Sequence, residues 1–205
     1  MTAGASSAAG VALTFDDGPD PRWTPAVLDA LADAGAHATF FLMAPRAARH
    51  PELVRRIRDG GHAIGLHCER HVRHSELTAA ALEEDTRVAL GRFADVGEHP
   101  VLWRTPWGIV AEHTPAVARR HDLCLVHWTA DTEDWAGHDP DAMLGRVAPD
   151  IQPGAVVLAH DGLGPGSTRD GCANTVALIA PLVALAADRG LACRALTEPA
   201  VAVRA

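Results

Sequence analysis

Two adjacent carboxylates, Asp16 and Asp17, follow directly after the apolar run 11–15. Neighbouring side chains at the end of a strand point to opposite sides, so one carboxylate can bind a metal ion while the other faces a substrate. The Gly-Pro dipeptide that follows is also typical of an ordinary turn. The pair therefore suits either a metal site or an acidic turn before a helix.

A second polar segment, residues 67–71, follows the apolar run 63–66 and contains His67 and His71. Imidazoles four residues apart lie on one face of a helical turn, where both can bind one ion. His74 lies three residues further on, so the ligand pair could include it instead, and a His-rich loop without a metal is the alternative. One carboxylate and two imidazoles would leave a coordination position open for water, which is typical of a catalytic metal site.

Three further side chains at the ends of apolar runs have ion-pairing or acid–base chemistry. Arg104 can hold a carboxylate in its ionised form through two hydrogen bonds, although a single Arg is more often a surface residue. His160 ends an otherwise apolar run and can transfer protons if a carboxylate such as Asp134 orients it. Each residue alone has a simpler structural explanation, and only their conjunction with the Asp and His pairs favours an active site.

The segments that would position these residues alternate between two hydrophobic patterns. Short, nearly continuous apolar runs are typical of buried parallel strands. They occupy residues 11–15, 38–43, 63–66, 101–103, 123–128, 155–159 and 191–196. Helical patterns occupy residues 24–35, 51–60, 78–94, 114–120, 140–147 and 175–189. The alternation predicts an α/β fold, a single-domain distorted (β/α) barrel of about seven parallel strands with its active site at their carboxyl ends.

The composition is that of a soluble globular protein, since 48% of the 205 residues are hydrophobic and 21% are charged. The 18 basic residues are all Arg and are outnumbered by 26 acidic residues, which gives a net charge of -8. Nucleic-acid binding depends on a basic face, so no nucleic-acid partner is expected. No apolar run reaches the roughly 18 residues of a membrane-spanning helix.

Residues 1–10 are small and polar, and we expect them to form a flexible N-terminal segment before a catalytic domain at residues 11–205. They contain neither the basic region nor the apolar stretch of a signal peptide. We therefore expect a cytoplasmic protein, unless the chain is a trimmed form of an exported enzyme.

Five motifs in this chain resemble, in the same order, those of the polysaccharide deacetylase family, carbohydrate esterase family 4, whose shared unit is the NodB homology domain. They are TFDDGP at residues 14–19, H-x-x-x-H at 67–71, R-x-P-x-G at 104–108, D-x-x-D-W at 131–135 and a form of L-x-L-x-H that ends at His160. The resemblance extends over residues 11–196 and implies a NodB-type barrel.

The resemblance also implies a metal site and a base. Asp17, His67 and His71 would bind a divalent metal ion, most often Zn²⁺ in this family, although Co²⁺ or Ni²⁺ also support activity. Asp16 would be the general base, and Arg104 would orient it. One departure from the family pattern is Cys68, which stands where Ser or Thr is usual.

The remaining implied roles concern the acid and the substrate. His160 would donate a proton to the leaving nitrogen, and Asp134 would keep the imidazole charged and aimed. A backbone N–H, for which the family points to Trp107, would help to stabilise the oxyanion. The residues expected to contact the substrate are Pro106, Trp107, Trp135 and Leu158.

The implied activity is metal-dependent removal of an N-linked acetyl group from an amino sugar, as a free oligosaccharide, a glycan or a glycosylated small molecule. A hydrolase of another non-peptide carbon–nitrogen bond in a small metabolite is the alternative, and the intact Asp-His-His set favours deacetylation. A non-catalytic carbohydrate-binding protein that stacks sugars on its Trp residues is a third possibility. The expected partner is an N-acetylated carbohydrate or small molecule, and the motifs indicate no oligomeric state.

Overall fold

The computed structural model of the protein describes residues 10–197. All strand pairs in this part of the chain are parallel. The strands are β1 (Gly10–Asp16), β2 (Ala38–Met43), β3 (Ala63–Cys68), β4 (Leu102–Trp103), β5 (Cys124–Leu125), β6 (Ala130–Asp131), β7 (Val156–His160) and β8 (Ala192–Cys193). Their order is β5-β4-β3-β2-β1-β7-β6, and β8 pairs with the start of β1. The predicted distorted barrel of parallel strands is confirmed, in the form of a half-barrel.

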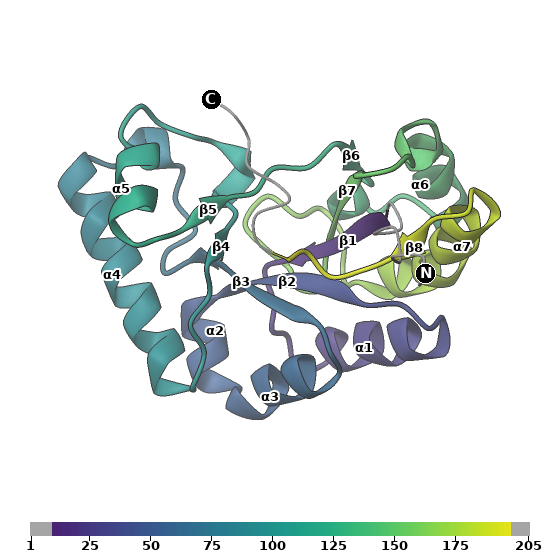
Figure 1. The fold of residues 1–205 in the computed structure, drawn as a ribbon, viewed down its shortest axis with the longest axis horizontal. Coiled ribbons are helices and arrows are strands. Elements are labelled where there is room, and N and C mark those ends of the chain that lie inside the picture. Colours follow the sequence, from purple (N-terminus) through teal and green to yellow (C-terminus); the bar gives the residue numbers. More distant parts are fainter. Residues whose placement is uncertain (1–9, 198–205) are drawn as a thin grey trace, which may run out of the picture.

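The helices form an arc around this sheet in Figure 1, from α5 and α4 through α2, α3 and α1 to α7 and α6. Their bounds are α1 (Trp23–Asp33), α2 (Ala44–Arg49), α3 (Pro51–Asp59), α4 (Ala79–Asp95), α5 (Thr114–Arg120), α6 (Pro140–Val147) and α7 (Ala173–Asp188). Single 3₁₀ turns are η1 (His74–Glu76), η2 (Pro106–Gly108), η3 (Asp134–Ala136) and η4 (Ala148–Asp150). Helix α2 is not predicted from the sequence, because six residues are too few for a clear helical period.

The two faces of β1 point to different surroundings. Leu13 and Phe15 belong to the large apolar core that the helices cover. Ala12 belongs to a second, smaller core on the inner face of the half-barrel. Because side chains alternate along a strand, Thr14 and Asp16 share this inner face. The fold thus places the first carboxylate at the carboxyl end of a central strand, facing into the half-barrel.

The strand predicted for residues 123–128 is confirmed only in part: β5 covers Cys124–Leu125, and the chain then continues to β6 at the opposite edge of the sheet. The N–H of Val126 donates to the carbonyl of Trp103 at 2.8 Å, on the β4 side. The N–H of Thr129 donates to the carbonyl of Val156 at 2.9 Å, on the β7 side. Since residues three apart pair with opposite edges, the chain between them crosses the open side of the half-barrel.

The flexible segment predicted for residues 1–10 lies outside the described residues, except for Gly10, which begins β1. Residues 198–205 lie outside them as well. Within the described part of the chain, no helix combines the length and the apolar character that crossing a bilayer requires.

Candidate active site

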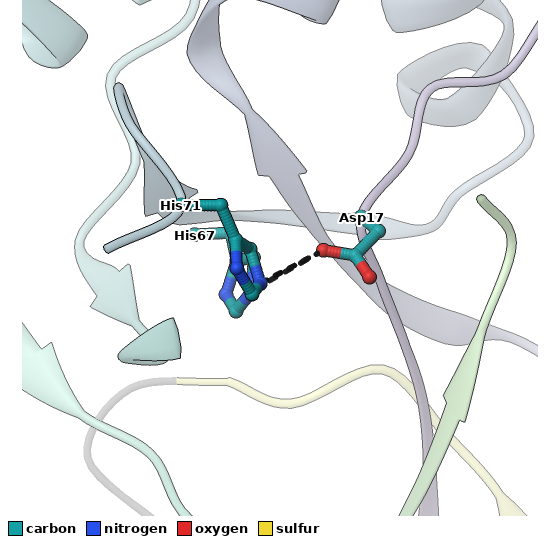
Figure 2. Close-up of side chains that lie close together, drawn as sticks. All are labelled: Asp17, His67 and His71. Carbon is teal, nitrogen blue, oxygen red and sulfur yellow. Dashed lines mark ion pairs between the residues drawn. The ribbon is translucent and has the colours of Figure 1, made fainter. Parts of the chain in front are cut away.

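Asp17, His67 and His71 lie together at the carboxyl ends of β1 and β3, as Figure 2 shows. Their ligand atoms all lie within 4.8 Å of one another. Oδ1 of Asp17 is 3.4 Å from Nε2 of His67 and 3.3 Å from Nε2 of His71. Ligands at about 2.0–2.1 Å from a tetrahedral zinc ion are themselves about 3.3 Å apart. The observed separations therefore fit three ligands of one ion.

The hydrogen bonds around the cluster leave these ligand atoms free. Oδ1 of Asp17 is buried and accepts no hydrogen bond from the described residues, although both imidazoles lie within ion-pair range. Nδ1 of His67 lies 2.8 Å from the carbonyl oxygen of Arg104. A carbonyl only accepts, so Nδ1 carries a proton and is engaged there, which leaves Nε2 as the ring nitrogen that faces Asp17.

The charge state of Asp17 also suits a cation. Burial alone would raise the pKa of this carboxyl, but His67 and His71 hold the pKa well below its usual value. Asp17 is therefore ionised. One carboxylate and two imidazole nitrogens, all buried and facing one another, are a donor set that fits a divalent metal ion.

A β-bulge aims His67 at this cluster. Leu42 of β2 pairs with Leu66, and the next residue, Met43, pairs with Cys68, so that His67 is an extra residue in the ladder. Such an insertion re-aims the side chain of the extra residue.

Two residues that the sequence left open lie outside the cluster. Cys68 is buried, and burial and nearby carboxylates raise the pKa of its thiol well above the usual value, so the thiol is neutral. His74 is also buried, with Nδ1 3.1 Å from Oγ1 of Thr114 and its ring against Trp103. Burial lowers the pKa of His74 to about 4, so this imidazole is a neutral part of the core.

Arg104 forms the first ion pair of the site, with Asp16. The guanidinium is fully buried over the ring of Phe41, and its Nη1 donates to Oδ1 of Asp16 at 2.9 Å. The same nitrogen donates to Oγ1 of Thr14 at 2.7 Å, and Nη2 donates to the carbonyl of His127 at 3.3 Å. The expected pair of hydrogen bonds to the carboxylate is thus a single one, because Thr14 precedes Asp16 on the same face of β1 and shares the donor.

His160 and Asp134 form the second ion pair. Nδ1 of His160 is 2.7 Å from Oδ1 of Asp134, and the backbone N–H of His160 donates to Oδ2 at 2.9 Å. Burial alone would lower the pKa of His160, but the carboxylate raises this pKa to about 9. Burial would likewise raise the pKa of Asp134, but His160 and Arg169 lower it to about 2. The imidazole is therefore charged at neutral pH, with Nδ1 engaged.

A cavity of about 340 Å³ connects the ligand cluster and both ion pairs. Of the residues predicted for the site, those that line it are Asp16, Asp17, His67, His71, Trp107, Trp135, Leu158 and His160. Trp107 and Trp135 are 37% and 40% exposed and lie at the rim. Arg104 and Asp134 are buried behind the lining. Pro106 is buried and is not among the lining residues.

The sequence does not predict the other lining residues as site residues, and three of these have a large or charged side chain: Trp128, Asp131 and Arg169. Asp131 could have been found, since it opens the D-x-x-D-W motif. Trp128 reaches the cavity because residues 126–129 cross the half-barrel. Arg169 lies in the Gly-rich loop 161–172, which has no hydrophobic period to interpret.

Known proteins resemble the chain in sequence and in structure. A family model described as polysaccharide deacetylase matches residues 3–126. A chitooligosaccharide deacetylase of Bradyrhizobium sp. (strain ANU 289) is 38% identical over 161 residues, which cover 78% of this chain and 74% of the relative. A peptidoglycan-N-acetylglucosamine deacetylase of Bacillus cereus is 35% identical over 175 residues, which cover 84% and 79%. The structure of a family 4 carbohydrate esterase from Streptomyces lividans in complex with acetate superposes with a TM-score of 0.84 at 30% identity, over 95% of this chain and 97% of that one.

Proposed function

The chain belongs to the polysaccharide deacetylase family, carbohydrate esterase family 4, and from that membership we propose that it removes an N-linked acetyl group from an amino sugar. The reaction is the hydrolysis of a carbon–nitrogen bond other than a peptide bond. The observation that carries the proposal is a single cavity that meets the Asp-His-His cluster, the Asp16–Arg104 pair and the Asp134–His160 pair. We assign this activity to one catalytic domain, residues 11–205.

Asp17, His67 and His71 would hold a divalent metal ion, Zn²⁺ in the first place and Co²⁺ or Ni²⁺ as alternatives. The spacing of the three ligand atoms and the unpartnered Oδ1 of Asp17 support this assignment. The chemistry that such an ion supplies is polarisation of a carbonyl group and activation of water.

Asp16 would act as the general base that takes a proton from the attacking water. Its carboxylate lines the cavity next to the ligand Asp17. Arg104 would fix the direction of this carboxylate through Oδ1. Because Arg104 is fully buried, its charge is not screened by solvent and acts directly on Asp16.

The backbone N–H of Trp107 would help to stabilise the oxyanion that forms on the acyl carbon. Trp107 has a φ of 52° in η2, and a left-handed conformation is costly for a residue other than Gly. Strained backbone of this kind is often found at functional sites. Its ring lies edge-on to His71, with ring centroids 4.2 Å apart, so the side chain of Trp107 contacts the ligand cluster.

His160 would protonate the leaving nitrogen, since an amine anion is a very poor leaving group. Nδ1 is engaged by Asp134, which leaves Nε2 as the donor toward the cavity. Leu158, two residues earlier on β7, shares the cavity face with His160 and would contact the acetyl methyl together with Trp107 and Trp135.

The substrate class that we propose is an N-acetylated carbohydrate, and the two sequence relatives are named for chitooligosaccharides and for peptidoglycan. Hydrolysis of a different amide remains the second candidate, and the complete ligand cluster argues against it. The use of Trp residues as sugar-stacking platforms in a non-catalytic binder receives less support, because Trp103 is only 2% exposed and its Nε1 donates to the carbonyl of His67.

Acetate release tests this proposal. The purified protein is incubated with acetylated chitooligosaccharides, peptidoglycan fragments and small N-acetyl amino sugars, before and after chelation and after Zn²⁺ is restored. We expect release that chelation removes and Zn²⁺ restores. Absence of acetate from every substrate, in protein shown to contain metal, would transfer the assignment to a different amide bond.

A further inference from the structure

Arg169 lies in loop 161–172, which joins β7 to α7, yet only 5% of its side chain is exposed. The same loop supplies Gly162, Gly164 and Gly166 to the wall of the cavity. Arg169 itself lines the cavity as well. A charged side chain this deeply buried in a Gly-rich loop is costly unless its hydrogen bonds are satisfied by specific partners.

Those partners converge on the acid side of the site. Nη1 of Arg169 donates to Oδ2 of Asp134 at 2.8 Å, and it also donates to Oγ1 of Thr175 at the start of α7. Nη2 donates to the carbonyl of His160 at 3.2 Å and contacts Sγ of Cys172 at 3.2 Å. One guanidinium thus connects the end of β7, its own loop and α7 around a single carboxylate.

The two carboxylate oxygens of Asp134 therefore contact two different cationic side chains, His160 and Arg169. Oδ1 faces Nδ1 of His160, while Oδ2 accepts hydrogen bonds from Arg169, from the hydroxyl of Thr175 and from the backbone N–H of His160. Three donors on Oδ2 fix the plane of the carboxylate, and that plane fixes the direction of the imidazole.

The charge of Arg169 has a second effect on the same pair. Asp134 stabilises the protonated imidazole, and a positive charge on the far oxygen weakens that stabilisation. A donor that holds its proton too tightly transfers it slowly, because the best catalytic pKa lies near the working pH.

We propose that Arg169 is a positioning residue for the proton donor: it orients the Asp134 carboxylate behind His160 and limits how strongly that carboxylate retains the proton on His160. The proposal rests on the proposed function, in which His160 is the acid. It goes beyond that function by assigning a role to a side chain that none of the five sequence motifs contains.

The main test is a double-mutant cycle on acetate release by the metal-loaded protein. Arg169→Ala is expected to lower kcat about tenfold, a part of the roughly 10²–10⁴-fold that a positioned acid supplies, with KM unchanged. In a His160→Ala background, the same substitution is expected to change kcat less than twofold, because Arg169 would act only through His160. A full additional loss in that background, or a rise in KM that accounts for the whole effect, would overturn the proposal.

Two companion measurements separate a local role from a loss of folding. Guanidinium ions at millimolar concentration are expected to restore activity to Arg169→Ala, and urea at the same concentration is not. Arg169→Lys keeps the charge and is expected to retain more kcat than Arg169→Ala, so it also tests the proposal if the Ala variant fails to fold. Equal loss in both variants, with no rescue of Arg169→Ala by guanidinium, contradicts the assignment.

Arg189→Ala is the matched control. Arg189 also joins separate segments through carbonyls, those of Ala148 and Ile151, both at 2.7 Å, but it lies outside the cavity lining. Its removal is expected to leave kcat within twofold of the wild-type value.

A measurement that does not depend on enzyme activity can test the role of Arg169 separately from the proposed function. The NMR titration of His160 in the metal-free protein is expected to move to higher pH in Arg169→Ala, because a nearby positive charge is lost. Besides Asp134 and Arg169, the charged groups that face His160 are Asp16, Asp17 and Asp131, and the substitution leaves all three in place. An unmoved titration overturns the proposal even in an active enzyme, whereas missing acetate release from the wild type overturns only the proposed function.

Discussion

The two ion pairs of the cavity are built from the same kinds of groups but arranged in opposite ways. On the β1 side, the carboxylate of Asp16 lines the cavity, and its partner Arg104 is fully buried. On the β7 side, the carboxylate of Asp134 is 1% exposed, and it is the cation of His160 that lines the cavity. In each pair, one member lines the cavity and can meet a substrate, while its partner lies behind the lining.

The hydrogen bonds follow the same division. Asp16 accepts a single hydrogen bond from Arg104, which leaves the carboxylate able to take up a proton. Asp134 accepts from His160, Arg169 and Thr175, and this set holds it ionised. The comparison indicates that the first pair is made to receive a proton and the second to release one.

The largest effect is expected from removing the carboxylate of Asp16, which would receive the proton. Asp16→Asn is expected to lower acetate release by at least about 100-fold, because an amide cannot act as a base, while the protein keeps its metal. His67→Ala should lose both metal and activity. Acetate assays with metal analysis after gel filtration distinguish the two variants, and near-normal turnover of Asp16→Asn would show that the base is wrongly assigned.

On the releasing side, Asp134→Asn is expected to lower kcat by about 100-fold, because an amide stabilises the imidazolium less than a carboxylate does. The alkaline limb of the pH profile of kcat should move to lower pH, since the pKa of His160 falls when the carboxylate is lost. Asp139→Asn is the control, because Asp139 caps α6 through Oδ1, a role that Asn also fills. If the alkaline limb of Asp134→Asn stayed at the wild-type pH, the Asp134–His160 pair would not be the proton-releasing pair that we propose.

The releasing pair should also make stability depend on pH. The pKa of His160 is raised from 6.5 to about 9, so its contribution is fully present below pH 6.5 and is lost as the pH rises through about 9. The pKa of Asp134 is lowered from 3.8 to about 2, so its contribution is present above pH 3.8 and is lost as the pH falls through about 2.

Thermal unfolding of the metal-free protein measures this dependence. The difference in Tm between wild type and His160→Gln is expected to be largest between about pH 4 and 6.5 and to shrink toward pH 9. For a protein of this size, each kcal/mol corresponds to about 2–4 °C. A difference that grows toward alkaline pH would contradict the assigned direction of the shift.

The smallest effects on kcat and on the pH profile are expected from substituting the Thr residue that contacts each ion pair. Thr175→Val removes a donor from Asp134, so we expect a loss of kcat of about fivefold, equivalent to about 1 kcal/mol, and a small upward move of the alkaline limb. Thr14→Val removes an acceptor from Arg104, which does not titrate, so neither limb should move. Equal shifts in both variants would show that the pH profile reports general packing and not the second pair.

The receiving side could be predicted from the sequence more completely than the releasing side. Asp16, Asp17 and His67 lie on or directly beside central strands whose apolar runs are long enough to recognise, and strand ends of a parallel sheet meet at one edge. The bulge at His67 was not predictable, because it depends on the register with β2 and not on local pattern.

On the releasing side, the motifs point to Asp134 and His160, but the support behind them is not visible in the sequence. Arg169 reaches Asp134 from a loop 35 residues further along the chain, and no periodicity marks such a contact. The run 123–128 predicts one uninterrupted strand, because an apolar crossing segment and an apolar strand have the same composition. Only the hydrogen bonds of Val126 and Thr129 to opposite edges separate the two.

That crossing has a consequence for how the protein behaves at high concentration. An open sheet normally presents unpaired N–H and C=O groups at its edges, which can template pairing between molecules. Here β5 and β6, the terminal strands, are two residues long, and residues 126–129 join one edge to the other. Such short terminal strands offer few groups for strand-to-strand pairing between molecules, so we expect the half-barrel to resist this route of aggregation without closing into a full barrel.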